Sequence, residues 1–229
     1  MPSFQLISAH TCPFVQRSAI TLNLKQVEYE TRYVDLGDKP AWFLELSPLG
    51  KVPLLLVREG EREDQREIVL FESAVINEYL DEVTEGSLLP ADPLLRARHR
   101  GMIELASACI ADAWRMGVAT SEADSRAAAE ALRGKLARFE AELVGPFFTG
   151  EELSLVDTAS IPMLQRAAWT DELRPELEVF AGLPRVRGWL EAAEQLDAVR
   201  RSTVEDIRER YWDYLAKREG SWVGAAVSR

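Results

Sequence analysis

The chain has 229 residues, a net charge of −11 and 47% hydrophobic residues, so it can bury the core of one large or two ordinary domains. Its acidity argues against nucleic acid as a partner, because phosphates would be repelled. No apolar run approaches the roughly 20 residues that cross a bilayer, and the N-terminus lacks the basic-then-apolar pattern of a secretory signal. The two cysteines form no disulfide framework and, with two histidines, offer no metal-ligand spacing. We therefore expect a reducing, cytoplasmic setting without membrane contact or metal.

The first segment is typical of a strand followed by a helix that starts at a cysteine. Residues 4–7 alternate apolar and polar side chains, and Pro13 suits the first position of a helix of about three turns. Cys12 is then the N-cap, where unpaired N–H groups and the helix dipole would lower the pKa of the thiol. Cys12 is therefore a candidate nucleophile; an inert cap or a small buried side chain is the alternative. Val15 stands where a Cys-x-x-Cys motif has its second sulfur, so an external thiol would have to resolve any disulfide.

The next elements complete a small sheet. Residues 27–34 read as a strand parallel to the first, because strand, helix and strand within about 35 residues form a βαβ unit. A short helix over residues 41–46 follows. A strand beginning at residues 51–57 and another at residues 68–71 then form a hairpin across the charged turn 58–67.

The hairpin leads directly into Glu72 and Ser73, and then into a helix with one apolar face that ends near residue 83. Ser73 is a natural N-cap. A helix start with an acidic residue and a hydroxyl suits a ligand that has both an ammonium and a carboxylate group, the carboxylate lying on the helix N–H groups. Plain capping is the alternative.

Turn residues cluster at residues 84–93, which we interpret as a linker. It divides the chain into an α/β domain of residues 1–83 and an all-α domain of residues 94–229. The second domain is rich in Ala, Leu, Arg and Glu and has helical periodicity nearly to its end. Within it, Ser154 and Asp157 have the form of a capping box, and Cys109 lies in an apolar helical stretch typical of a core.

This order of elements resembles the cytosolic glutathione transferases, which have a thioredoxin-like α/β domain followed by a helical domain. The resemblance covers nearly the whole chain, and it rests on markers that are modest singly but strong in this order and spacing. They are Thr11-Cys12-Pro13-Phe14, Asp38-Lys39-Pro40-Ala41-Trp42-Phe43, Gly50-Lys51-Val52-Pro53, Phe71-Glu72-Ser73-Ala74, Glu78-Tyr79-Leu80-Asp81 and Leu88-Leu89-Pro90-Ala91-Asp92-Pro93. Cys-Pro-Phe resembles the omega class, whose members carry a cysteine where other classes use tyrosine or serine and typically perform thiol transfer and dehydroascorbate reduction.

The resemblance implies a role for each matching residue. Cys12 would form a mixed disulfide with glutathione, and Val52, before a family-typical cis Pro53, would pair its backbone with the cysteinyl part of the peptide. Glu72 and Ser73 would hold the γ-glutamyl end, and Lys39 would pair with the glycine carboxylate.

The second substrate should lie between the domains. The candidates for contacting it are Phe14, Trp114, Met163, Arg166 and Tyr211. Ordinary core packing is the alternative for each apolar one. Arg166 would meet an anionic substrate or pair with a surface carboxylate.

The resemblance thus implies a homodimeric, glutathione-dependent thiol transferase or reductase with a cysteine nucleophile, acting on a disulfide, dehydroascorbate or a related electrophile. One alternative is an interaction module without catalysis, similar to the stringent-starvation proteins that bind RNA polymerase. Cys12 together with Lys39 and Glu72-Ser73 argues against that alternative, since an interaction module does not need a complete glutathione site. Another is a conjugating glutathione transferase, whose activity would survive replacement of Cys12 by alanine.

Overall fold

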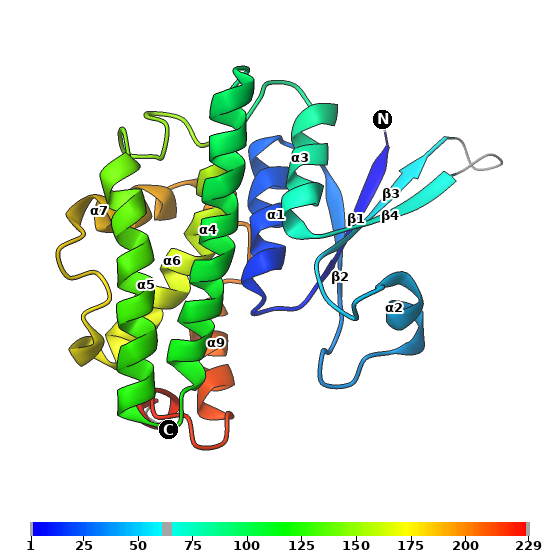
Figure 1. Cartoon of the computed structure of the whole chain (residues 1–229). Helices are drawn as coiled ribbons and strands as arrows, with labels where there is room; N and C mark the ends of the chain where they lie inside the picture. The colour runs from blue at the N-terminus through cyan, green and yellow to red at the C-terminus, as the bar shows by residue number, and fades with distance from the viewer. Residues whose placement is uncertain (1, 61–65, 228–229) are drawn as a thin grey trace.

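A computed structural model describes residues 2–60 and 66–227 as an α/β part followed by a helical part (Figure 1), which confirms the predicted fold class. The α/β part consists of β1 (Ser3–Ser8), α1 (Pro13–Leu24), β2 (Tyr29–Tyr33), α2 (Ala41–Leu46), β3 (Leu54–Glu59), β4 (Arg66–Phe71) and α3 (Ser73–Val83). The helical part consists of α4 (Pro93–Val118), α5 (Glu122–Glu142), α6 (Leu155–Leu173), η1 (Pro175–Leu177), α7 (Pro184–Glu194), α8 (Asp197–Arg200), α9 (Ile207–Ala216) and η2 (Gly224–Ala226). Within the described residues, no helix is both long and apolar enough to span a bilayer.

The sheet is mixed, with the strand order β2-β1-β3-β4. β1 and β2 are parallel, as the βαβ pattern predicts, and β3 runs antiparallel to both β1 and β4. The hairpin strands are longer than the sequence indicates, because β3 continues to Glu59 and β4 already begins at Arg66. Of the turn predicted between them, residues 61–65 lie outside the described residues.

Helix α1 lies between the sheet and the helical part (Figure 1). Every residue from 15 to 22 is buried, because one side of the helix packs on the sheet and the other on the helical part. Ala19 belongs to the apolar core of the sheet, whereas Ile20 belongs to the core of the helical part. Polar side chains on such a helix, here Gln16 and Arg17, must find partners inside the protein.

The helical part is centred on the start of α6, where the predicted capping box is present. The Asp157 carboxylate accepts hydrogen bonds from the backbone N–H of Ser154 (2.7 Å) and of Phe148 (2.8 Å) and from the indole N–H of Trp189 (2.7 Å). Cys109 is fully buried in the same core, as predicted. One buried carboxylate thus ties three segments of the helical part together.

The segment between α3 and α4 covers residues 84–92, because Pro93 is already the first residue of α4. Asp92 caps that helix by accepting a hydrogen bond from the backbone N–H of Leu95 at 2.8 Å. The segment is held to the α/β part by Asp81 and Lys25, which form an ion pair of 2.7 Å.

Candidate functional site

Three segments of the α/β part meet at a small cavity of about 120 Å³. They are the first turn of α1, the loop before β3 and the junction between β4 and α3. The cavity brings together Val52, Pro53, Glu72 and Ser73, four of the residues that the sequence singles out. The Sγ atom of Cys12 lies 4.0 Å from the carbonyl oxygen of Val52, to which the thiol donates. The cysteine therefore lies at the edge of this cavity.

Cys12 is the N-cap of α1 and Pro13 its first residue, as predicted, but the expected acidification of the thiol is wrong for the free protein. Burial raises the pKa of Cys12 above its ordinary value. The backbone N–H groups of Val15 and Phe14 and the guanidinium groups of Arg166 and Arg17 lower this pKa without overcoming the desolvation. Cys12 is half-buried and lines the cavity between the two parts of the chain, so its desolvation depends on distant segments that the sequence around it does not indicate.

The start of α3 lies one residue earlier than predicted. Glu72, not Ser73, is the N-cap, and its backbone has φ 68° and ψ 117°. A left-handed φ strains a residue with a Cβ atom, and strain of this kind concentrates at binding and catalytic sites. Ser73 is the first helical residue and is buried; its hydroxyl accepts a 3.5 Å hydrogen bond from Arg17. The hydroxyl therefore does not cap the helix, and plain capping does not account for it.

The loop before β3 carries the cis peptide bond between Val52 and Pro53 that the sequence makes plausible. Lys39 is exposed and does not line the small cavity. Its Nζ atom is 3.5 Å from the position that a Cβ atom on Gly50 would occupy. The ammonium group is thus close to the loop that precedes β3.

A second, larger cavity of about 1110 Å³ opens between the two parts of the chain. It is lined by Cys12 and by all five residues predicted to contact a second substrate: Phe14, Trp114, Met163, Arg166 and Tyr211. Trp114 is 52% exposed and donates from its indole N–H to the Tyr214 hydroxyl at 3.1 Å. Met163 and Tyr211 are buried in the helical core, so packing is their main role.

Arg166 is almost fully buried and reaches from α6 to the cysteine loop. Its Nη1 donates to the side-chain oxygen of Gln16 and to the carbonyl oxygen of Pro162 (3.2 Å), and its Nη2 donates to the carbonyl oxygen of Thr11 (3.4 Å). Of the two alternatives for Arg166, pairing with a surface carboxylate is therefore wrong within the described part of the chain. Burial lowers the pKa of Arg166 to about 10, so this side chain is still a cation at neutral pH.

The sequence reasoning missed Arg17 and Gln16, which are both buried between the two parts of the chain. Arg17 contacts three other helices and Gln16 bonds to Arg166. The available signal is spacing: residues 14, 17 and 20 share one face of α1, and that face carries Phe14 and the apolar Ile20. Among the described residues, no group of three His, Cys, Asp or Glu side chains is placed to hold a metal ion.

Comparison with known proteins adds independent evidence. Residues 11–83 match the family model of the glutathione S-transferase N-terminal domain, and residues 95–192 match that of the C-terminal domain. The chain is 31% identical over 214 residues to glutathione S-transferase omega-1 of Mus musculus, covering 92% of this chain and 84% of that protein. It is 34% identical over 202 residues to pyrimidodiazepine synthase of Drosophila melanogaster, covering 85% and 78% respectively. The crystal structure of glutathione transferase Omega 2C from Trametes versicolor is similar with a TM-score of 0.78 at 27% identity, covering 95% of this chain and all of that one (100%).

Proposed function

The chain belongs to the glutathione S-transferase family and is omega-like, and from that premise we propose that it is a glutathione-dependent thiol transferase with Cys12 as its nucleophile. The observation that carries the proposal is the position of the Cys12 sulfur. It lies at the N-terminus of α1, within reach of Val52 at the small cavity, and it also lines the large one. A sulfur placed there can react with a disulfide whose two halves occupy the two cavities.

Glutathione would occupy the small cavity. The backbone of Val52 would pair with the cysteinyl residue of the peptide in the manner of an added strand, which brings the ligand's sulfur toward Cys12. Glu72 would pair with the γ-glutamyl ammonium group, and Ser73 with the open N–H groups of α3 would hold its carboxylate. Lys39, whose ammonium group lies beside Gly50, would meet the glycine carboxylate.

The chemistry is two thiol–disulfide exchanges. In the first, the Cys12 thiolate attacks the glutathionyl sulfur of a mixed disulfide, a new sulfur–sulfur bond to glutathione forms, and the substrate leaves as its thiolate. In the second, the thiolate of another glutathione attacks the glutathionyl sulfur bound to Cys12, which gives oxidised glutathione and restores the Cys12 thiolate. Val15 stands where a second enzyme thiol would have to be, which supports resolution by external glutathione.

The positive groups around Cys12 stabilise its thiolate, which is the form that reacts. The thiol starts protonated in the free protein because burial raises its pKa. The guanidinium groups of Arg17 and Arg166 and the N–H groups at the start of α1 then stabilise the thiolate that forms during exchange. Trp114 and Phe14 supply apolar surface for the substrate in the large cavity.

The proposal is tested by measuring the reduction of a small glutathione mixed disulfide, that of 2-mercaptoethanol, for the wild type and for Cys12→Ala and Cys109→Ala. We expect Cys12→Ala to abolish the reaction. Cys109→Ala should retain it, because Cys109 is buried away from both cavities. Activity that survives in Cys12→Ala would overturn the proposal, and conjugation of an electrophile that survives there would favour a conjugating enzyme.

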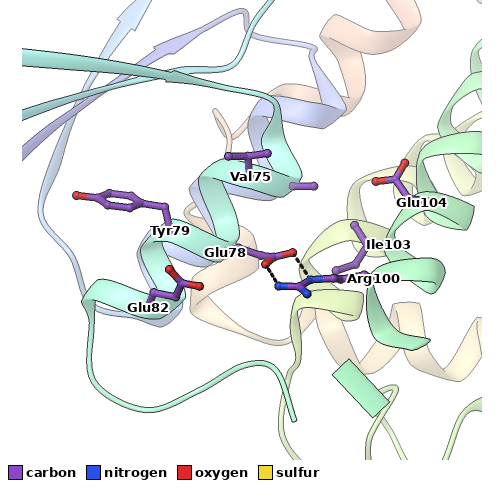
Figure 2. A pocket seen from close by; sticks show the side chains of 8 residues that line it. Val75, Glu78, Tyr79, Glu82, Arg100, Ile103 and Glu104 are labelled. Carbon is purple, nitrogen blue, oxygen red and sulfur yellow. Dashed lines mark hydrogen bonds and ion pairs between the residues drawn. The ribbon is translucent and has the colours of Figure 1, made fainter. Parts of the chain in front are cut away.

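We further propose that the protein is a homodimer. Apolar side chains are exposed along α3 and at the start of α4, with Val75 at 55%, Leu94 at 78% and Leu95 at 48% exposure. A groove of about 470 Å³ lies between these helices, and Figure 2 shows the Glu78 carboxylate and the Arg100 guanidinium joined across it. A second copy of the chain would cover this apolar face.

Light scattering tests the dimer. We expect the mass of two chains for the wild type and for Leu44→Glu, a control on α2, which lies on the other side of the α/β part. Val75→Glu should shift the protein toward the mass of one chain. A wild type with the mass of one chain would contradict the proposal.

A reducing, cytoplasmic location suits the two free thiols, Cys12 and Cys109.

A further inference from the structure

Arg17 is a buried cation with neutral partners. Its side chain is 1% exposed. Its Nε donates to the carbonyl oxygen of Ala159 at 2.8 Å, and its Nη1 donates to the hydroxyls of Ser107 at 2.9 Å and Ser73 at 3.5 Å. The guanidinium carbon also lies 5.0 Å from the centre of the Phe14 ring. Each of these groups is uncharged.

Among the described residues, Arg17 has no carboxylate in direct contact; the Glu104 carboxylate attracts its charge from a greater distance. Its Nη2 is buried without a hydrogen-bond partner, and in residues 2–60 and 66–227 no carboxylate comes within 4.0 Å of the guanidinium. Burial lowers the pKa of Arg17 to about 10 although the Glu104 carboxylate acts in the opposite direction, so the side chain still carries its charge at neutral pH. A buried charge of this kind is costly unless an anion compensates it. Two anions can compensate it during function: the Cys12 thiolate and an anionic group of a bound ligand.

The contact with Ser73 shows where the anionic group of a ligand would lie. Ser73 is the first residue of α3, where the N–H groups of the helix are open to an anion. Its hydroxyl oxygen accepts from Arg17, and its hydroxyl hydrogen has no acceptor among the described residues. The hydroxyl is thus oriented by a cation on one side and free to donate on the other. The small cavity, which Ser73 lines, is the open space beside it.

We propose that Arg17 is a positioning residue for glutathione, orienting the Ser73 hydroxyl and acting as the buried counter-ion of the γ-glutamyl carboxylate. The inference rests on the proposed function, because it takes glutathione as the ligand of the small cavity. The charge of Arg17 would add to the partial positive charge at the N-terminus of α3. It also gives one physical reason why an acidic protein binds an anionic peptide: the attraction is local and buried.

The test compares two ligands, glutathione and 4-aminobutanoyl-cysteinyl-glycine, which lacks only the γ-glutamyl carboxylate. Their dissociation constants are measured by calorimetry under reducing conditions. We expect the wild type to prefer glutathione, and Arg17→Gln to reduce that preference about tenfold, as for a hydrogen bond to a charged group. Arg17→Lys should keep part of the preference, since it keeps the charge. Arg17→Gln should have less effect when Ser73 is already alanine, because the two residues act on the same carboxylate.

Ser107→Ala is the matched control, since it removes another hydroxyl partner of Arg17 on α4, outside the small cavity. It should lower stability but keep the preference for glutathione, whereas Ser73→Ala should reduce that preference. If Arg17→Gln does not fold, Arg17→Lys decides instead: a preference equal to that of the wild type would overturn the inference, as would an equal preference in both serine variants. An unchanged preference in a folded Arg17→Gln would overturn it as well. A wild type that binds neither ligand would instead refute the proposed function.

Discussion

Replacing Asp81 by asparagine should destabilise the protein strongly, because the change leaves a buried ammonium group without its counter-ion. The Oδ1 atom of Asp81 lies 2.7 Å from the Nζ atom of Lys25, and the two side chains are only 6% and 5% exposed. Lys25 also donates to the carbonyl oxygens of Glu85 (3.1 Å) and Gly86 (2.9 Å), and Asp81 accepts from the N–H of Leu88 at 2.8 Å. The pair therefore ties the end of α1 to the segment between α3 and α4.

Breaking one partner of a buried ion pair lowers the free energy of unfolding by about 3–5 kcal/mol. At roughly 2–4 °C per kcal/mol for a chain of this size, the Tm of Asp81→Asn should fall by about 6–20 °C in thermal unfolding followed by circular dichroism. The control is Glu67→Gln, which breaks the exposed pair between Glu67 and Arg58 (41% and 30% exposed). It should lower the free energy of unfolding by about 1 kcal/mol or less. A loss in Asp81→Asn no larger than that of Glu67→Gln would refute the reasoning.

Three further predictions concern the site. Because burial raises the pKa of Cys12, its alkylation by iodoacetamide in the free protein should accelerate about tenfold per pH unit from pH 6 to beyond pH 8, and a plateau at pH 7 would contradict this. Lys39→Met should weaken glutathione binding about two- to fivefold at low salt but leave the binding of γ-glutamylcysteine ethylamide unchanged, because that ligand lacks the glycine carboxylate; an equal loss for both ligands would count against the assigned role. Glu72→Gln should weaken the binding of glutathione about tenfold but not that of glutaryl-cysteinyl-glycine, which lacks the γ-glutamyl ammonium group. Calorimetry with the two ligands tests this difference in binding.

The features that the sequence predicts correctly are set by neighbours in the chain. Pro13 after Cys12 specifies a helix start, and Ser154 three residues before Asp157 specifies another. The alternation of apolar residues and the charged turn specify the hairpin of β3 and β4. Such signals also place the residues around the small cavity, since each lies at the end of an element that the pattern identifies.

The features that the sequence does not predict depend on contacts between segments that lie far apart along the chain. The partners of Arg17 lie 56, 90 and 142 residues further along the chain, so the apolar neighbours on its helix face indicate burial but do not identify these partners. The pKa of Cys12 has the same origin, because a local argument counts the helix N-terminus but not the burial of the thiol. The start of α3 shifts to Ser73 because Glu72 takes a left-handed backbone conformation that residue preferences disfavour.

The central claim is that Cys12 is an accessible thiol that forms a mixed disulfide with glutathione. The most direct measurement is the intact mass of the wild type and of Cys12→Ala after incubation with oxidised glutathione, before and after treatment with dithiothreitol. We predict a single adduct of about 305 Da on the wild type, reversed by dithiothreitol and absent from Cys12→Ala. A wild type that gains no mass, or a Cys12→Ala variant that gains the same adduct, would contradict the claim.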